Sequence, residues 1–426
     1  MLAQPVTWKT AQHYQDYYIW GLSCADDSNC FAVASYQQTL VSMILRTTNG
    51  GLSWDSIYSE RRLLSGPTIP TYVGVARPTR SRAIVVADSG LVLRTTDGGA
   101  TWTRQRIGGK ATIAWIAMAD SMHGLLGLRT APNSLMTTSD GGETWESIAL
   151  PLEAQSMGIS DIAMPTPSTF IALMAWYPRN TIVRSDDGGR TWRVFPNALP
   201  DSTAGSLWFN DSLNGWAAGD VYTGVGDLRR EVISRTTDGG ATWGTRLNAE
   251  VGWKFGLTDI AFTSPDSGLA VGGIGTILRT SDGGANWVVE PNDLTSLQIL
   301  YVAYPRGSRG IIVTTLGRVA LPADLVPADV TPAVNADDGT LAASCSVYPN
   351  PVANAPLTVL LSRSFSQPVH IVITDIMGRV ARTWDAAADS GGNELHIDMS
   401  GLPAGAYMLR LAVGENNVGR IVYVVR

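Results

Sequence analysis

The stretch from Thr47 to Trp54 reads TTNGGLSW, and five near copies of it follow along the chain of 426 residues. The copies lie 43 to 51 residues apart, measured between Asn49, Asp97, Asp140, Asp187, Asp238 and Asp282. A period of about 40 to 50 residues is typical of one four-stranded propeller blade. The repeat therefore predicts a β-propeller and an all-β fold.

Each copy has the chemistry of a tight hairpin. The acidic side chain can accept hydrogen bonds from the backbone of its own turn, and the Gly-Gly pair permits positive φ angles. A tryptophan closes every copy: Trp54, Trp102, Trp145, Trp192, Trp243 and Trp287. The segments before each copy read as short strands, so each unit has strands A, B, C and D with the repeat on the C–D hairpin.

A seventh unit is degenerate. Gly310–Val319 aligns with Ala83–Val92 but is followed by no Gly-Gly pair and no tryptophan. Val6–Thr10 resembles the strand Ala100–Arg104 that follows the second repeat. We therefore expect a seven-bladed ring, spanning residues 1–326, in which the N-terminal strand completes the last blade and leaves no open edge.

The repeats resemble the Asp-box, or bacterial neuraminidase repeat. Five copies keep the aspartate, and the last has Asn286 where the family has threonine. The resemblance implies a propeller but no activity, because sialidases, sorting receptors, xyloglucan-degrading enzymes and photosystem assembly factors share it. The whole propeller is most similar to the photosystem-assembly-factor-like group, which implies at most a scaffold that binds proteins.

A second domain is expected after a linker rich in Pro, Ala and Asp at residues 327–343. Residues 344–426 alternate like a small Ig-like β-sandwich. Three motifs in it resemble the C-terminal sorting domain of type IX secretion cargo from Bacteroidetes. The matching residues are Pro349, Asn350, Pro351, Gly378, Arg379, Pro403, Gly405 and Tyr407.

This resemblance implies the type IX secretion machinery as a partner, and a protein that is secreted or attached to the outer-membrane surface. Met1–Gln4 has neither a basic start nor an apolar core, so a signal peptide is expected to be already removed or left out of this chain. The sequence contains no run of about 18 apolar residues, so no transmembrane segment is expected. With 31 basic and 37 acidic residues, the net charge of −6 disfavours nucleic-acid binding.

Three cysteines are present, and two are close in sequence. Cys24 and Cys30 flank the expected A–B turn of the first blade, where a hairpin can bring the sulfurs together. A disulfide is the preferred interpretation, and two buried thiols are the alternative. No metal site is expected, since neither cysteine has histidine neighbours. No cofactor is expected either.

Arginines recur at one place in the repeat. In the third unit, Thr137 stands three residues before the box aspartate. The other five units carry an arginine at this place: Arg46, Arg94, Arg184, Arg235 and Arg279. An anion-binding ring is one interpretation. Hydrogen bonding between blades is favoured, because strand C lies away from the central channel.

Catalysis would need charged groups on the innermost strands. Sialidases use an arginine triad with Tyr, Glu and Asp, and retaining glycosidases in general need two carboxyl groups about 5 Å apart. The seven expected inner strands contain only Asp161 and Asp259 as acids, with no Glu and no Arg. We therefore expect a chain that is not an enzyme.

The face opposite the boxes is the expected binding surface, because the B–C loops there vary in length. Its candidate ligand-binding residues combine aromatic rings with arginines: Trp176, Tyr177, Arg179, Tyr222, Arg229, Arg230 and Trp253. Such groups suit a surface glycan or a protein partner, and ordinary loop packing is the alternative. The expected function is a binding or scaffold module; the alternatives are a self-associating subunit of an extracellular polymer or coat, and a sialidase-like surface glycoside hydrolase.

Overall fold

The computed structural model describes residues 6–13, 17–36, 41–61, 70–107, 112–129, 134–176, 179–199, 203–222, 229–251, 256–292, 294, 298–305, 310–314, 317–326, 345–348, 357–361, 369–375, 379–386, 394–403, 405–413 and 416–424. The chain forms two compact units, Met1–Asp329 and Val330–Arg426.

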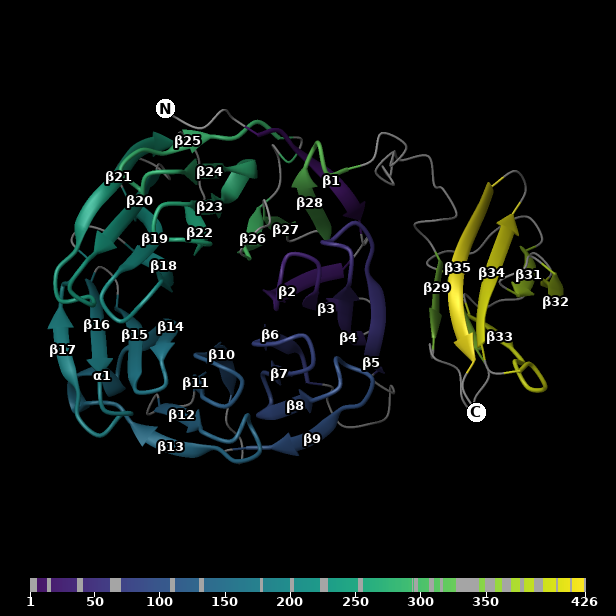
Figure 1. Ribbon diagram of the computed structural model, residues 1–426, viewed down its shortest axis with the longest axis horizontal. Helices are drawn as coiled ribbons and strands as arrows, with labels where there is room; N and C mark the ends of the chain where they lie inside the picture. Colours follow the sequence, from purple (N-terminus) through teal and green to yellow (C-terminus); the bar gives the residue numbers. More distant parts are fainter. Residues whose placement is uncertain are drawn as a thin grey trace. The chain divides into compact units, whose positions relative to one another are not determined.

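The described part of the first unit contains seven four-stranded antiparallel sheets, arranged as blades around a common axis (Figure 1). Blade 1 has β2 (Tyr17–Cys24), β3 (Cys30–Tyr36), β4 (Val41–Thr47) and β5 (Asp55–Arg61). Blade 2 has β6 (Tyr72–Ala76), β7 (Ala83–Ala87), β8 (Leu91–Thr95) and β9 (Thr103–Arg106). Blade 3 has β10 (Ile113–Met118), β11 (Gly124–Leu128), β12 (Ser134–Thr138) and β13 (Glu146–Ala149).

The next three blades repeat this order. Blade 4 has β14 (Gly158–Thr166), β15 (Thr169–Trp176), β16 (Arg179–Ser185) and β17 (Arg193–Pro196). Blade 5 has β18 (Thr203–Phe209), β19 (Gly215–Tyr222), β20 (Arg229–Thr236) and β21 (Gly244–Val251). Blade 6 has β22 (Leu257–Phe262), β23 (Gly268–Gly272), β24 (Ile277–Thr280) and β25 (Val288–Val289). Short helices occur at α1 (Leu152–Gln155) and η1 (Gly273–Gly275).

Blade 7 is completed by the N-terminal strand. Its order is β26 (Ile299–Ala303), β27 (Ile311–Thr314), β28 (Arg318–Pro322) and then β1 (Trp8–His13), which pairs antiparallel with β28. The first strand of each blade contacts the first strands of both neighbours, and β26 contacts β2 to close the circle. The prediction of seven blades closed by the N-terminal strand is confirmed.

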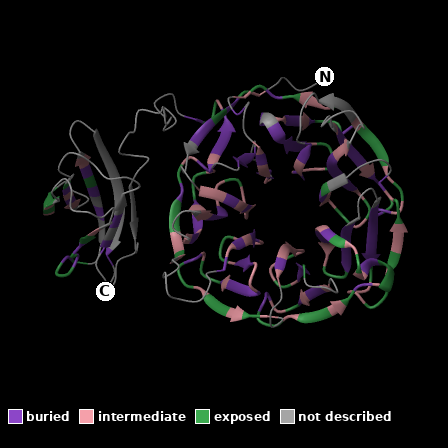
Figure 2. Ribbon diagram, turned by 180° about the vertical axis from the view of Figure 1, so that it is seen from behind, coloured by how far each residue is buried: buried purple, intermediate pink, exposed green. Residues whose placement is uncertain are grey.

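The hydrophobic core lies between neighbouring blades. One cluster, for example, joins Phe31 and Ile44 of blade 1 to Val85 and Leu93 of blade 2. The second strands are buried on both faces, as in β7, whereas the fourth strands are largely exposed, as in β9. Figure 2 shows the same gradient from the buried inner strands to the exposed rim. Each blade therefore depends on its neighbours for burial of its apolar side chains.

The second unit is the expected small β-sandwich. One sheet has the order β29 (Cys345–Tyr348), β30 (Leu357–Leu361), β33 (Glu394–Ile397); the other has β32 (Val380–Ala386), β31 (Val369–Asp375), β34 (Gly405–Val413), β35 (Asn416–Val424). Of the sorting-motif residues, Pro349, Asn350, Pro351 and Gly378 lie outside the described residues. Tyr407 is buried in the core and donates its hydroxyl hydrogen bond to the carbonyl oxygen of Pro403 at 2.9 Å.

No helix in the described part of the chain is long and apolar enough to cross a membrane.

Candidate functional site

The Asp-box is a hairpin held together by its own side chains. In the second box, Thr95 Oγ1 donates to Asp97 Oδ1 at 2.8 Å and accepts from the Gly99 N–H at 2.9 Å. The Thr101 hydroxyl and backbone N–H both donate to the carboxylate, and these bonds lower the pKa of Asp97 to about 2. Because both carboxylate oxygens accept hydrogen bonds within the turn, the box acts as a structural element.

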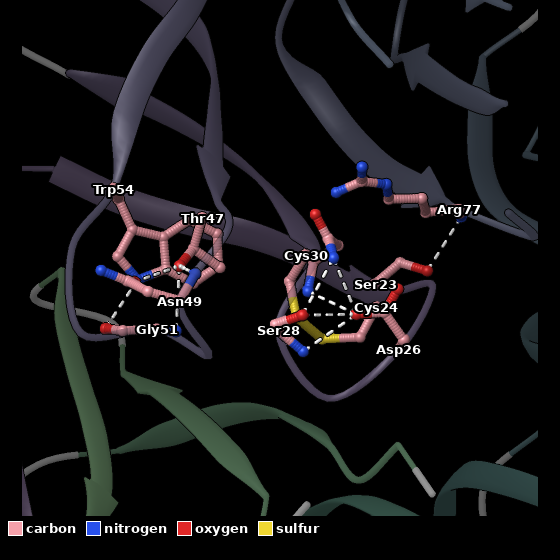
Figure 3. The surroundings of a disulfide bond; sticks show 11 residues. Ser23, Cys24, Asp26, Ser28, Cys30, Thr47, Asn49, Gly51, Trp54 and Arg77 are labelled. Carbon is pink, nitrogen blue, oxygen red and sulfur yellow. Dashed lines mark hydrogen bonds between the residues drawn. A yellow bond between two sulfur atoms is a disulfide. The ribbon is translucent and has the colours of Figure 1, made fainter. Parts of the chain in front are cut away.

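The boxes and the A–B turns lie on one face of the ring. Each first box glycine donates its N–H to the A–B turn of the same blade, as Gly50 does to the carbonyl oxygen of Ser28 at 3.0 Å. That turn in blade 1 carries a disulfide between Cys24 and Cys30, with an S–S distance of 2.01 Å. Figure 3 shows the disulfide turn beside the first box. The B–C hairpins lie at the opposite ends of the strands and therefore form the other face.

Five of the seven predicted ligand-binding residues lie on the strands of two B–C hairpins in neighbouring blades. Trp176 pairs with Arg179 at the end of the β15–β16 hairpin, and Tyr222 pairs with Arg229 at the end of the β19–β20 hairpin. Trp176 and Tyr222 are the last residues of their strands, at the ends opposite the boxes; we call this side of the propeller the loop face. These pairings concern the backbone, because the four side chains lie outside the described part of the structure, as do residues Tyr177 and Trp253.

An acid lies next to this hairpin end. Arg230 is half-buried on β20, and Glu231 beside it is 3% exposed. Burial raises the pKa of Glu231, and a hydrogen bond with Thr276 of blade 6 opposes that rise. Glu231 is not among the site residues predicted from the sequence. Its position inside a strand flanked by arginine was the available signal that it is a buried acid.

Equivalent residues of the seven innermost strands, which surround the central channel, share one level of the ring. Every first strand has a β-bulge at the same register, and the residue that follows the bulge occupies the same level. In blade order these residues are Gly21, Gly74, Trp115, Asp161, Ser206, Asp259 and Tyr301. The polar side chains are therefore contiguous on blades 4 to 6 and are bordered by two aromatic rings.

The two channel carboxylates link neighbouring blades. Asp161 Oδ2 accepts from the backbone N–H of Leu207 in blade 5 at 2.7 Å. Asp259 Oδ2 accepts from the backbone N–H of Val302 in blade 7 at 2.9 Å, and its Oδ1 accepts from the Ser206 hydroxyl at 2.9 Å. The sequence analysis found both acids but missed Ser206. The shared position directly after each bulge would have identified it.

The surroundings of both carboxyl groups raise their pKa values toward neutral pH. Burial raises the pKa of Asp161 from 3.8 to about 7, and the nearby charge of Asp259 acts in the same direction. Burial raises the pKa of Asp259 to about 6, although the N–H of Val302 opposes the shift. Tyr301, at the edge of the same group, has its pKa raised to about 12, mainly by burial.

These shifts predict that the propeller becomes less stable as the pH rises from 5 to 8. A carboxyl group whose pKa is higher in the folded state binds protons more tightly there, so stability falls as the pH passes from the unfolded pKa near 4 up to the folded values of about 6 and 7. Allowing for solvent in the channel, we expect a loss of about 1–2 kcal/mol, measured by urea denaturation across this range. The box carboxylates have lowered pKa values, so their contribution is lost only below about pH 4.

The double variant Asp161→Asn/Asp259→Asn tests the assignment. It should remove at least half of the pH dependence, and burial of Glu231 and Glu290, which raises both their pKa values, accounts for the remainder. Asp97→Asn is the matched control and should keep the slope. An unchanged slope in the double variant would show that the channel acids do not titrate in this range.

The channel holds two carboxyl groups whose oxygens are engaged in hydrogen bonds between blades. Its two acids use their oxygens to accept backbone N–H groups, whereas a nucleophile needs a free oxygen facing the substrate. The guanidinium of Arg129 lies 4.7 Å from the ring centre of Trp115. No group of three or more His, Cys, Asp or Glu side chains that could hold a metal ion occurs among the described residues.

These features define the class: a seven-bladed Asp-box β-propeller followed by a β-sandwich. Residues 346–424 match the family described as "Secretion system C-terminal sorting domain". The chain therefore carries a sorting domain of the type IX secretion system, as the three motifs predicted. This domain supports export by that machinery.

Comparison with known proteins agrees with the propeller assignment. The chain is 22% identical to the photosystem II assembly lipoprotein Ycf48 of Synechococcus sp. (strain CC9902), over 63% of this chain and 74% of that protein. It is 25% identical to xyloglucanase Xgh74A of Acetivibrio thermocellus over 42% of this chain, but spans only 28% of that enzyme. A solved structure described as "YCF48 bound to D1 peptide" has a TM-score of 0.57 at 18% identity, covering 76% of this chain and 98% of that one. At this identity, the likeness shows the fold alone.

Proposed function

We propose that this protein is an exported, non-catalytic propeller that binds a protein or glycan partner at the cell surface through its B–C loop face. The observation that carries the proposal is that both channel acids are engaged in hydrogen bonds between blades. Asp161 and Asp259, the acids of the inner strands, bind backbone N–H groups of the next blade. These hydrogen bonds give both acids a structural role between blades. The loop face, where the B–C loops vary in length, is then the surface best suited to binding.

The composition of the loop face supports binding there. The hairpin ends of blades 4 and 5 pair an aromatic residue with an arginine, Trp176 with Arg179 and Tyr222 with Arg229. Aromatic rings and guanidinium groups are enriched where proteins bind partners and sugars. A propeller of the same fold is described as bound to a peptide, which is consistent with a peptide partner.

A second candidate function is a surface glycoside hydrolase. The similarity to a xyloglucanase favours it, as do two channel acids with pKa values of about 7 and about 6. The engagement of their oxygens by backbone groups argues against it, because neither acid offers a free nucleophile.

Site-specific photocrosslinking tests the binding proposal. Tyr222→benzoylphenylalanine places the crosslinker on the loop face, and Leu213→benzoylphenylalanine, at a residue 50% exposed on the box face of the same blade, is the matched control. In a type IX-secreting bacterium, we expect one defined partner to crosslink from position 222 and not from position 213. The same product from both positions, or a product from position 213 alone, would contradict the assignment of the face.

The hydrolase alternative is tested separately with xyloglucan. We expect no release of reducing sugar by the purified chain. Hydrolysis that disappears in the Asp161→Asn variant would overturn the non-catalytic proposal and establish the enzyme.

A further inference from the structure

Arginines fill the junctions between most blades. Three of them come from the third strand of one blade and donate to the carbonyl oxygen of the first glycine in the next box. Arg46 Nη1 donates to Gly98 at 3.5 Å, Arg184 Nη1 to Gly239 at 3.1 Å and Arg235 Nη1 to Gly283 at 3.2 Å. In the same position Arg94 instead pairs with the box residue Glu143 at 2.8 Å. The expected hydrogen bonding between blades is therefore confirmed for these three arginines, whereas Arg279 pairs with Glu290 of its own blade.

The junction between blades 3 and 4 lacks this arginine. Thr137 stands at the equivalent position, and its hydroxyl donates to the carbonyl oxygen of Gly124 in its own blade at 3.0 Å. A Cβ added to Gly188, the first glycine of the fourth box, would meet no atom within 4 Å, whereas one added to Gly239 would meet the Arg184 guanidinium. Among the described residues, none donates a hydrogen bond to the Gly188 carbonyl oxygen.

The absence of an arginine leaves an open groove. Its volume is about 670 Å³, and its walls are strand β13 of blade 3 and the fourth box. Gly189, the second glycine of that box, is half-buried, while the second glycines of the other five boxes are buried: Gly51, Gly99, Gly142, Gly240 and Gly284. The groove is therefore a local departure from the repeat.

The groove is lined by acceptor groups, by an aromatic ring and by one cation of its own, the exposed Arg190 of the fourth box. Glu146 lies directly opposite Thr137 on β13 and is exposed. Asp187 also lines the groove, but its carboxylate accepts hydrogen bonds within the box. Trp192 contributes an aromatic side chain, and Ile148 an apolar one. One available carboxylate, one unused carbonyl oxygen and one ring match the groups that a guanidinium binds.

We propose that this groove binds an arginine side chain presented by a partner polypeptide. The inserted guanidinium takes the place that Arg46, Arg184 and Arg235 occupy at their own junctions. It donates one hydrogen bond to the Gly188 carbonyl oxygen and pairs with Glu146. Arginine is favoured over lysine because its planar fork can reach two acceptors and stack on a ring at once. This site lies on the box side of the rim and does not depend on the proposed loop-face function.

A short peptide tests the site directly. The probe is acetyl-Gly-Arg-Gly-amide, and the matched control replaces arginine by citrulline, which keeps the shape and loses the charge. Methyl NMR follows the δ1 methyl of Ile148 in the groove; Ile57, which packs on Gly99 at a junction occupied by arginine, is the internal reference. We expect the arginine peptide to shift Ile148 and not Ile57, with binding at least tenfold weaker for citrulline.

Two variants separate the groove from general charge attraction. Thr137→Arg supplies the missing arginine within the chain and should weaken peptide binding at least tenfold while the protein stays folded. Glu146→Gln should weaken it about fivefold, and Thr137→Ser should leave it unchanged. The proposal would be overturned if the Thr137→Arg variant bound the arginine peptide as tightly as the original protein does. It would also be overturned if a peptide with citrulline or lysine in place of arginine bound as tightly as the arginine peptide, or if the Ile148 methyl signal did not shift.

Discussion

A Trp8→Ala variant should lower the free energy of unfolding of the propeller by about 3–5 kcal/mol, the range for truncating a large buried aromatic side chain. Trp8 is fully buried. Its ring packs in the cluster that joins blades 6 and 7, against residues such as Leu269 and Val271 of blade 6 and Ile312 of blade 7. Truncation would therefore leave a cavity at the point where the ring closes.

The backbone around Trp8 explains why the loss should not be confined to packing. The Trp8 N–H donates to the carbonyl oxygen of Pro291 at 2.8 Å, and the Ala323 N–H donates to that of Thr7 at 2.7 Å. Strand β1 thus holds together the end of blade 6 and β28, the third strand of blade 7. If truncation loosens β1, the edge of β28 loses its partner, and aggregation through that edge should increase.

Urea denaturation of the two variants Trp8→Ala and Lys9→Ala measures this effect. Lys9 is exposed on the same strand, so its truncation should change the free energy of unfolding by less than about 0.5 kcal/mol. A Trp8→Ala variant within about 1 kcal/mol of the original protein would mean that β1 is not essential for closure.

The fold was largely predictable because its information is local and repeated. The box motif indicates one hairpin per blade, and its period indicates the blade size. Closure was predictable for the same reason, since Val6–Thr10 resembles a strand that follows a box. The role of the arginines between blades also followed from their fixed place in the repeat.

The channel and the groove were harder to predict, because they depend on contacts between repeats. Ser206 is an ordinary strand residue in the sequence, and only the ring places it against Asp259 of the next blade. Thr137 was noted as an exception to the arginine pattern. The meaning of that exception required the position of Gly188 across the blade junction.

The two glycines at equivalent box positions provide the second large prediction. Gly239 and Gly188 have nearly the same backbone, with φ angles of 75° and 73°. An alanine at either position should cost about 1 kcal/mol for the left-handed conformation. At Gly239, a Cβ would also collide with Arg184 Nη1 and lie 2.9 Å from the carbonyl oxygen of Ser212. Displacing the Arg184 side chain, which is 4% exposed, adds an overpacking cost of about 1–3 kcal/mol.

Gly239→Ala should therefore lower the free energy of unfolding by about 3 kcal/mol, and Gly188→Ala by only about 1 kcal/mol. Denaturation of both variants measures the difference, with the backbone strain cancelled by the comparison. The gap should close in the Thr137→Arg background, because an arginine placed over Gly188 would then meet the added methyl group as well. Equal losses for the two glycines in the original chain would mean that the junction between blades 3 and 4 is as closed as the others, and the arginine groove would have no physical basis.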